Sequence, residues 1–169
     1  RMSNSYYFED LIATNPCAEQ FLPAWGVCNL GHLNLSRFVH DGQILWDDLA
    51  RAARLGVRFL DNVIDYTPYF FEENERVQKA ERRIGMGTMG LGELLIHLGV
   101  RYGSPESLEI IDKLYRFIAC EAYMASVELA KEKGPFPLCD PEKYIESGFM
   151  KGMPEEVREA VRQHGIRNV

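Results

Sequence analysis

The feature that most constrains the fold is a helical pattern of about thirty residues that begins at Ser104. Ser104 is a favoured helix N-cap, Pro105 follows at the first helical position, and Gly134-Pro135 ends the pattern. Apolar residues recur between them every three or four positions: Leu108, Ile111, Tyr115, Ile118, Ala122, Ala125 and Leu129. At about 1.5 Å per residue, this helix is roughly 45 Å long. It is long for an isolated small domain and is natural as a strut packed along a larger fold.

The rest of the chain also reads as mostly helical. Residues 47–65 have helical apolar spacing with acids in the first turn, and Thr67-Pro68 ends them. Residues 72–83 are a charged run that predicts a solvated helix face. Two short helices are expected at 140–147 and 154–164, and an apolar strand is expected to begin within 165–169. Irregular structure is expected for residues 1–12, and a turn at Asp41-Gly42.

The glycines between residues 85 and 90 satisfy the pattern G-x-G-x-x-G, which occurs in dinucleotide-binding folds. That motif needs an apolar strand before it, and residues 80–84 are too charged to form a buried parallel strand. The sequence therefore argues against a dinucleotide site. It predicts that the glycines allow close packing at the start of a helix through Leu91–Leu98, which Gly99 ends.

Composition excludes several classes of protein. The chain has 169 residues, 46% of them hydrophobic, and a net charge of −6, so it can bury a core but gives no support for a nucleic-acid or membrane-surface partner. It has no apolar run near 18 residues and no signal-peptide pattern. Its four cysteines lack a close C-x-x-C pair, which favours a reducing, cytoplasmic setting. The four histidines have no metal-ligand spacing, so no metal site is expected.

Candidate chemistry is concentrated in the short run from Asn15 to Glu19. Asn15, Cys17 and Glu19 alternate with Pro16 and Ala18, and in an extended segment alternate side chains project to one side. An amide, a thiol and a carboxylate in a row could bind and react with a polar substrate. A structural explanation stays open, because a free cysteine is often a small buried hydrophobe and Asn-Pro often opens a turn.

This run resembles the finger loop of the ribonucleotide reductase large, catalytic chain, which carries an Asn-x-Cys-x-Glu core. The segment Cys28-Asn29-Leu30-Gly31-His32-Leu33-Asn34-Leu35 resembles the family's second cysteine and the residues after it, and 82–91 (RRIGMGTMGL) is also similar. The short gap between Cys17 and Cys28 is most similar to the adenosylcobalamin-dependent branch. Ala18 is a departure, since glycine is more usual there, and its methyl group could narrow the space beside the substrate.

The resemblance implies a fold of the α/β class. Residues 1–169 would be a single helix-rich piece of a larger, ten-stranded α/β barrel. The finger loop, at about 13–31, would thread inside the barrel, and residues of about 43–164 would form a helical wall.

The resemblance also implies a reaction, in which hydrogen replaces the 2′-hydroxyl of a ribonucleotide. Cys17 would carry the thiyl radical that takes the 3′-hydrogen. Glu19 would be the general base on the 3′-hydroxyl, and Asn15 would hydrogen-bond the sugar hydroxyls. Cys28 would belong to the reducing cysteine pair, with its partner in the remainder of the reductase chain.

Further components are implied in the same way. Adenosylcobalamin would supply the radical, and an external dithiol such as thioredoxin would restore the cysteine pair. Two other functions remain open from the residues, a helical binding module without catalysis and a glycyl-radical relative. Cys120 is interpreted as a packing residue, and Cys139 is assigned no role.

Overall fold

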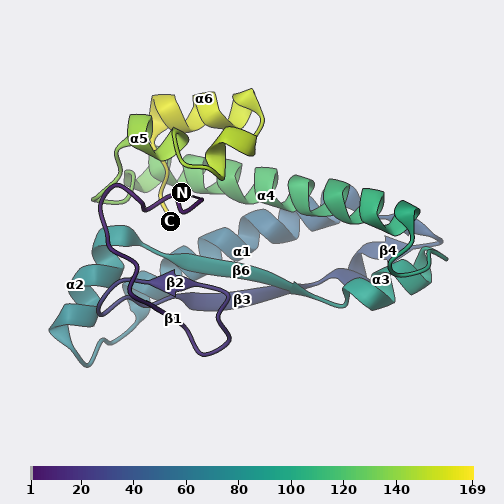
Figure 1. Ribbon diagram of the computed structural model, residues 1–169, viewed down its shortest axis with the longest axis horizontal. Helices are drawn as coiled ribbons and strands as arrows, with labels where there is room; N and C mark the ends of the chain where they lie inside the picture. Colours follow the sequence, from purple (N-terminus) through teal and green to yellow (C-terminus); the bar gives the residue numbers. More distant parts are fainter. Residues whose placement is uncertain (1) are drawn as a thin grey trace.

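The computed structural model describes residues 2–169 and has a mixed α/β fold. At its centre lie two parallel strands, β3 (Asn29–Asn34) and β6 (Ile84–Met89), which pair in register from Asn29 with Ile84 to Asn34 with Met89 (Figure 1). Parallel strands need a long crossover, and here it contains α1 (Trp46–Tyr66) and α2 (Glu72–Glu81). The interpretation of the chain as mostly helical did not include this central pair.

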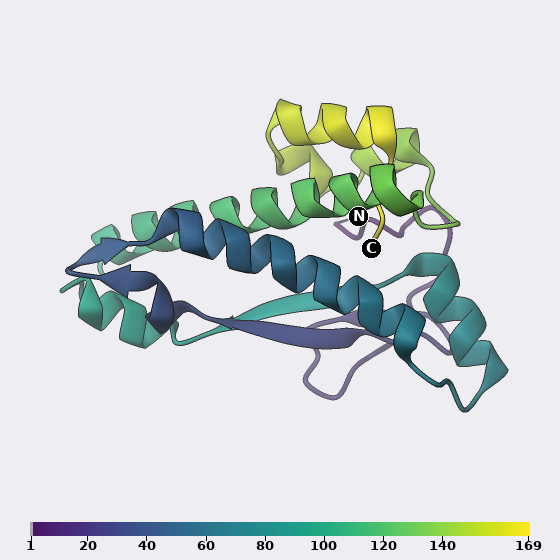
Figure 2. The same ribbon diagram turned by 180° about the vertical axis from the view of Figure 1, so that it is seen from behind.

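Two long helices lie side by side, and the first of them, α1, packs against both strands of the pair (Figure 2). In α1 the residues of one stripe are buried: Leu49, Ala53, Val57, Leu60 and Ile64. Helix α4 (Pro105–Lys133) packs against α1, begins at the Ser104 cap and ends at Gly134, which has a φ of 86°. Both predicted helices are therefore confirmed. The predicted apolar seam of α4 is only partly buried, because Leu108 and Tyr115 are exposed.

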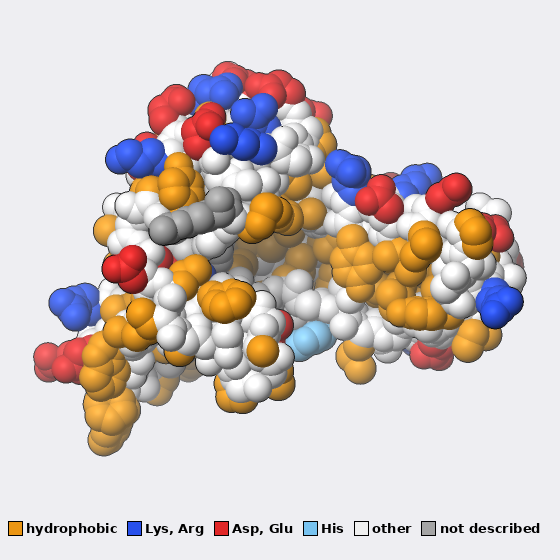
Figure 3. Space-filling view, in the orientation of Figure 1, with side chains coloured by type: hydrophobic (Ala, Val, Ile, Leu, Met, Phe, Trp, Pro, Cys, Tyr) orange, Lys and Arg blue, Asp and Glu red, His pale blue; other side chains and the backbone are white. Residues whose placement is uncertain are grey.

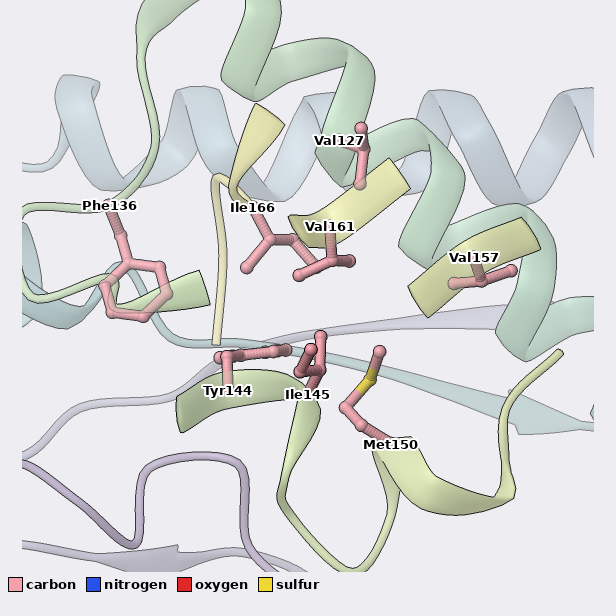
Figure 4. Close-up of a cluster of buried hydrophobic side chains, with 8 residues drawn as sticks. All are labelled: Val127, Phe136, Tyr144, Ile145, Met150, Val157, Val161 and Ile166. Carbon is pink, nitrogen blue, oxygen red and sulfur yellow. The ribbon is translucent and has the colours of Figure 1, made fainter. Parts of the chain in front are cut away.

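The C-terminal helices form a lobe over the second half of α4. The lobe contains α5 (Pro141–Ile145), the 3₁₀ helix η2 (Met150–Gly152) and α6 (Glu155–His164). Its apolar cluster, drawn in Figure 4, consists of Val127, Phe136, Tyr144, Ile145, Met150, Val157, Val161 and Ile166. Cys120 and Cys139 pack against this cluster, which confirms the packing interpretation of Cys120.

Shorter elements complete the fold. Strands β1 (Ala13–Thr14) and β2 (Phe21–Leu22) form one antiparallel hairpin, and β4 (Val39–His40) and β5 (Gln43–Ile44) form another around the predicted turn. The 3₁₀ helix η1 (Leu35–Phe38) follows β3, and α3 (Leu91–His97) follows β6. Residues 2–12 form turns and irregular structure, as expected, and Arg1 lies outside the described residues. Residues 2–169 form no closed barrel, and 165–169 form no strand.

The charged run at 72–83 is only partly a solvated helix face. Its first residues form the exposed side of α2, but the end of the run is buried: Gln78, Glu81, Arg82 and Arg83. Arg82 ends α2 with a φ of 48°, in the left-handed region. The prediction failed here because charge alone does not distinguish solvent from an internal ion-pair network.

A fully buried carboxylate, that of Asp61 in α1, organises this network. It accepts hydrogen bonds from Arg82 Nε at 2.8 Å, Asn168 Nδ2 at 2.9 Å and Lys133 Nζ at 3.2 Å. Arg167 Nε lies 3.3 Å from the same carboxylate. Burial alone would raise the pKa of Asp61, but the hydrogen bonds from Asn168 and Arg82 and the nearby positive charges lower it. Asp61 therefore ties α1 to the start of β6, the end of α4 and the C-terminal residues.

The glycine motif lies in a strand, not in the start of a helix as the sequence predicted. Gly85 and Gly87 belong to β6, and only Gly90, the N-cap of α3, begins a helix. A Cβ on Gly87 would lie 2.8 Å from His32 Cδ2, and one on Gly85 would lie 3.0 Å from Cys28 Sγ. The glycines therefore make space for the side chains of the β3 segment, and the predicted helix through residues 91–97 is confirmed.

A stability test separates Gly90 from its neighbour Gly92. Gly90 has a φ of 74°, and a Cβ there would lie 3.1 Å from the backbone nitrogen of Ser36. We expect Gly90→Ala to lower the free energy of unfolding by about 1–3 kcal/mol. Gly92 lies in α3 with open space around it, so Gly92→Ala should raise the free energy by about 0.5–1 kcal/mol. Urea denaturation measures both, and equal effects would contradict the explanation.

Candidate functional site

The candidate site begins at the tip of the β1–β2 hairpin. The Asn15 N–H donates to the Gln20 carbonyl at 3.1 Å, and the Ala18 N–H donates to the Asn15 carbonyl at 2.9 Å. The tip is therefore a hydrogen-bonded turn, and the expectation that residues 15–19 form an extended segment is wrong. The turn-opening role of Asn-Pro, which the sequence analysis left open, is the one that the structure shows.

Ala18 adopts a left-handed conformation with a φ of 63°. A Cβ makes this conformation unfavourable by about 1–2 kcal/mol, whereas glycine adopts it readily. The expected concern at Ala18 was reduced space beside the substrate. The structure identifies backbone strain instead, between the candidate residues Cys17 and Glu19.

The three candidate side chains of the turn differ in their surroundings. The Asn15 side-chain oxygen accepts a hydrogen bond from the Gln20 N–H at 2.9 Å, which leaves its amide nitrogen to donate elsewhere. Cys17 and Glu19 are exposed. Glu19 lines a cavity of about 360 Å³, together with Gln20, Arg83 and Phe149. Figure 3 shows that the surface is hollowed between the hairpin and the C-terminal lobe.

Cys28 lies at the end of the loop that connects β2 to β3. The chain folds back at a turn in which the Gly26 N–H donates to the Pro23 carbonyl at 3.1 Å. Cys28 then directly precedes β3, as Arg83 directly precedes β6, so these two residues lie at the start of the strand pair. The Cys28 side chain is half-buried beside Gly85.

The thiol of Cys28 is held in its protonated form. Burial raises its pKa to about 11, against the opposing effect of the Arg83 charge. The carboxylates of Glu81 and Glu19 raise the pKa further. Glu19 therefore acts on Cys28 through its charge, which brings two of the four predicted site residues into one electrostatic environment.

Sequence reasoning missed a buried cluster beside Cys28. Arg83 is 2% exposed and donates hydrogen bonds to Glu9 and, at 2.8 Å, to Glu81. Glu81 is 1% exposed, and burial raises its pKa to about 7, a rise that the Glu9 carboxyl increases and the hydrogen bond from Arg83 opposes. The Arg82-Arg83 pair was part of the family resemblance, but nothing in its pattern indicated burial.

The described residues contain no disulfide, no metal-binding cluster and no membrane-spanning helix. All four cysteines are free, so within residues 2–169 no disulfide joins Cys17 to Cys28. Within residues 2–169, no group of three or more His, Cys, Asp or Glu side chains is arranged to hold a metal ion. Among the described helices, none combines the length and apolar character needed to cross a membrane.

The strain at Ala18 can be measured. Ala18→Gly should raise the free energy of unfolding by about 0.5–1 kcal/mol, because glycine removes the left-handed penalty but adds freedom to the unfolded chain. Ala24→Gly is the matched control in the same segment, since Ala24 has no positive φ. That change should lower the free energy by about 0.4–1 kcal/mol. If both variants lose stability equally in urea denaturation, Ala18 is not strained.

Alkylation should separate the two site cysteines. With a pKa of about 11, the Cys28 thiol is ionised in roughly one molecule in a thousand at pH 8. The exposed Cys17 should therefore react with iodoacetamide on the order of tenfold faster or more. Cys120 and Cys139, whose thiol pKa values burial also raises, serve as slow internal controls. Mass spectrometry of the cysteine peptides measures each rate, and equal rates at Cys17 and Cys28 would contradict the assignment.

Comparison with known proteins identifies the family. A family model described as "Ribonucleotide reductase, barrel domain" matches residues 2–169. The vitamin B12-dependent ribonucleoside-diphosphate reductase of Mycobacterium tuberculosis (strain H37Rv) is 45% identical over 136 residues, which are 80% of this chain and 19% of that protein. The enzyme of the same name from Thermoplasma acidophilum is 44% identical over 129 residues, covering 76% of this chain and 17% of that protein.

A more distant relative extends the match over almost the whole chain. The ribonucleoside-diphosphate reductase large chain of Encephalitozoon cuniculi is 30% identical over 187 residues, covering 99% of this chain and 24% of that protein. The chain thus spans about a fifth of the length of the curated relatives that it matches. These matches favour a reductase over the helical binding module and over the glycyl-radical relative. The chain belongs to the ribonucleotide reductase family, in which it matches the barrel domain.

Proposed function

We propose that this chain carries part of the catalytic centre of an adenosylcobalamin-dependent ribonucleotide reductase. The observation that carries the proposal is that Glu19, two residues after the exposed Cys17, lines the hollow together with Arg83, whose charge acts on the half-buried Cys28 at the start of β3. Both cysteines are free. The names of the B12-dependent relatives support the choice of branch.

In this proposal Cys17 performs the radical step. Its exposed position on a turn lets the sulfur contact a ribose that enters the hollow. A thiyl radical at Cys17 takes the 3′-hydrogen atom of the sugar and returns one at the end of the reaction. The strained backbone at Ala18 then sets the directions of the two side chains that flank it.

Glu19 and Asn15 act on the sugar hydroxyls. The Glu19 carboxylate accepts the proton of the 3′-hydroxyl as the radical forms on carbon 3′, and the 2′-hydroxyl leaves as water with a proton from a thiol of the cysteine pair. Asn15 donates from its amide nitrogen, because its amide oxygen is already used by the Gln20 N–H. The turn therefore offers one acceptor and one donor beside the thiol.

Cys28 supplies reducing equivalents. Its thiol pairs with a cysteine elsewhere in the reductase chain, and the pair gives up two electrons to the sugar and becomes a disulfide. An external dithiol protein of the thioredoxin kind restores the pair by thiol–disulfide exchange. The raised pKa of Cys28 suits a group that delivers hydrogen rather than one that attacks as a thiolate.

The residues present fit a radical cofactor that approaches the hairpin. When bound, adenosylcobalamin supplies the organic radical with which the reaction begins. The Cys17 thiol suits this chemistry because it is free and exposed at a turn. We assign none of residues 2–169 to the cobalamin itself.

The architecture of the whole enzyme follows from the same proposal. The parallel pair β3–β6, backed by α1 and α4, is one segment of a ten-stranded α/β barrel completed by the rest of the reductase chain. The β1–β2 hairpin is the finger loop inside that barrel. The enzyme works in the cytoplasm, and its substrate is a ribonucleoside diphosphate or triphosphate.

Serine substitutions in the intact enzyme test the two cysteine roles. Cys17→Ser should abolish transfer of tritium from 3′-tritiated substrate, because a serine O–H bond is too strong to form the radical readily, while substrate binding survives. Cys28→Ser should keep tritium transfer and release free base instead of deoxynucleotide. A single-turnover assay follows the transferred tritium, the free base and the deoxynucleotide together.

Cys120→Ser is the control, because Cys120 only packs against the C-terminal lobe, and it should leave the products unchanged. Tritium release by Cys17→Ser would refute the radical assignment. Normal deoxynucleotide formation by Cys28→Ser would make that residue structural.

A further inference from the structure

Two carboxyl groups share a single guanidinium in the buried cluster beside Cys28. Arg83 Nη2 hydrogen-bonds both Glu9 and Glu81. The Arg83 and Glu81 side chains are almost fully buried, and that of Glu9 is 8% exposed. Among residues 2–169, Oε1 of Glu81 and Nε of Arg83 have no hydrogen-bond partner. The cluster therefore contains more acid than its one positive charge can neutralise.

A buried cluster of this composition retains a proton near neutral pH. Two ionised carboxylates beside one guanidinium would leave a net negative charge in a poorly solvated site, which is strongly unfavourable. A proton held on Glu81 removes that charge. The pKa of Glu81, raised to about 7 by burial and by Glu9 against the effect of Arg83, agrees with this argument.

The cluster lies next to Cys28 through the register of the strand pair. Asn29 pairs with Ile84, and Cys28 and Arg83 are the residues that precede them. Arg83 and Glu81 are also the charges with the largest effects on the Cys28 thiol, followed by Glu19. The site mechanism described above gives the cluster no role.

We propose that the Glu9–Arg83–Glu81 cluster gives the Cys28 sulfur its proton when the Cys28 disulfide is reduced. This proposal rests on the proposed function, in which Cys28 forms a disulfide once per turnover. It makes Glu81, beside Arg83 and Glu9, a proton source for the recovery of the enzyme, not for the reduction of the sugar.

The proton balance of the recovery step is simple. A thiolate of the external dithiol attacks the partner cysteine's sulfur, the S–S bond breaks, and the electron pair leaves on Cys28 Sγ. The cluster protonates that thiolate, and the proton lost by the dithiol to solvent later replaces the one taken from the cluster. The second thiol of the dithiol then releases the partner cysteine, so that two thiols form and the dithiol becomes a disulfide.

The proposal has a distinct pH signature. The charges that act on Cys28 are those of Arg83, Glu81 and Glu19, and those that act on Glu81 are those of Arg83 and Glu9. The cluster holds its proton below a pH of about 7 and loses it above that value. The recovery rate per dithiothreitol thiolate should therefore be constant at low pH and should fall above about pH 7.

The decisive variant is Glu81→Gln in the intact enzyme, since glutamine keeps the shape and the contact with Arg83 but cannot give up a proton. Enzyme that has completed one turnover is mixed with dithiothreitol, quenched with acid, denatured, alkylated with iodoacetamide in the unfolded state and examined by mass spectrometry for the Cys28 thiol. We expect the recovery rate at pH 6 to fall on the order of tenfold or more, and the inflection near pH 7 to disappear.

Three further variants test whether the effect is specific to the carboxyl groups of the cluster. Glu73→Gln, an exposed change on the same helix, should recover like the unmodified enzyme. Glu9→Gln leaves one carboxylate for one guanidinium, so it should move the inflection to lower pH even if Glu81→Gln does not fold. Glu81→Asp keeps a carboxyl group and should restore part of the rate.

The first turnover separates this proposal from the proposed function. Prereduced Glu81→Gln should make one equivalent of deoxynucleotide without dithiothreitol, as the unmodified enzyme does. Failure of the unmodified enzyme in that assay would overturn the proposed function itself. Recovery of Glu81→Gln at the normal rate with the same pH profile, or loss of its first turnover, would overturn only the role of the cluster.

Discussion

The structure depends most on the ion-pair network around Asp61. A carboxylate without solvent contact is tolerated only when its charge and hydrogen-bonding capacity are satisfied. The partners of Asp61 come from three distant parts of the chain: Arg82 before β6, Lys133 at the end of α4, and Arg167 with Asn168 near the C-terminus. Removing one partner of such a network typically costs about 3–5 kcal/mol, so these contacts fix the relative positions of the helices and β6.

The Asp61 network also determines the geometry of the candidate site. Arg82 is held by Asp61 and Asp65 in a left-handed conformation that ends α2 abruptly. Because of that ending, Glu81 and Arg83 turn inward at the start of β6, beside Cys28. The Asp61 network therefore fixes the framework through Arg82. The next residue, Arg83, belongs to the cluster beside Cys28, the candidate redox cysteine.

The sequence predicts the helices well because their spacing and caps are local properties, as at Ser104 and Gly134. It does not predict β6, whose glycines lack the side chains that make a strand recognisable and are explained only by His32 and Cys28 on the neighbouring segment. The sequence also does not indicate that the charged residues at the end of the 72–83 run are buried, because the residues that neutralise them are distant in sequence. The site residues came from the family resemblance, whereas alternation alone gave the wrong backbone shape for the turn.

The central strand pair has a consequence for handling the polypeptide in solution. In residues 2–169 each of the two strands is paired along one edge only, and beside β6 an apolar slot of about 270 Å³ extends under α4. An unpaired strand edge next to apolar surface is a template for intermolecular β-pairing. This polypeptide is therefore prone to edge-to-edge aggregation, and its colloidal behaviour will depend on concentration more strongly than its net charge suggests.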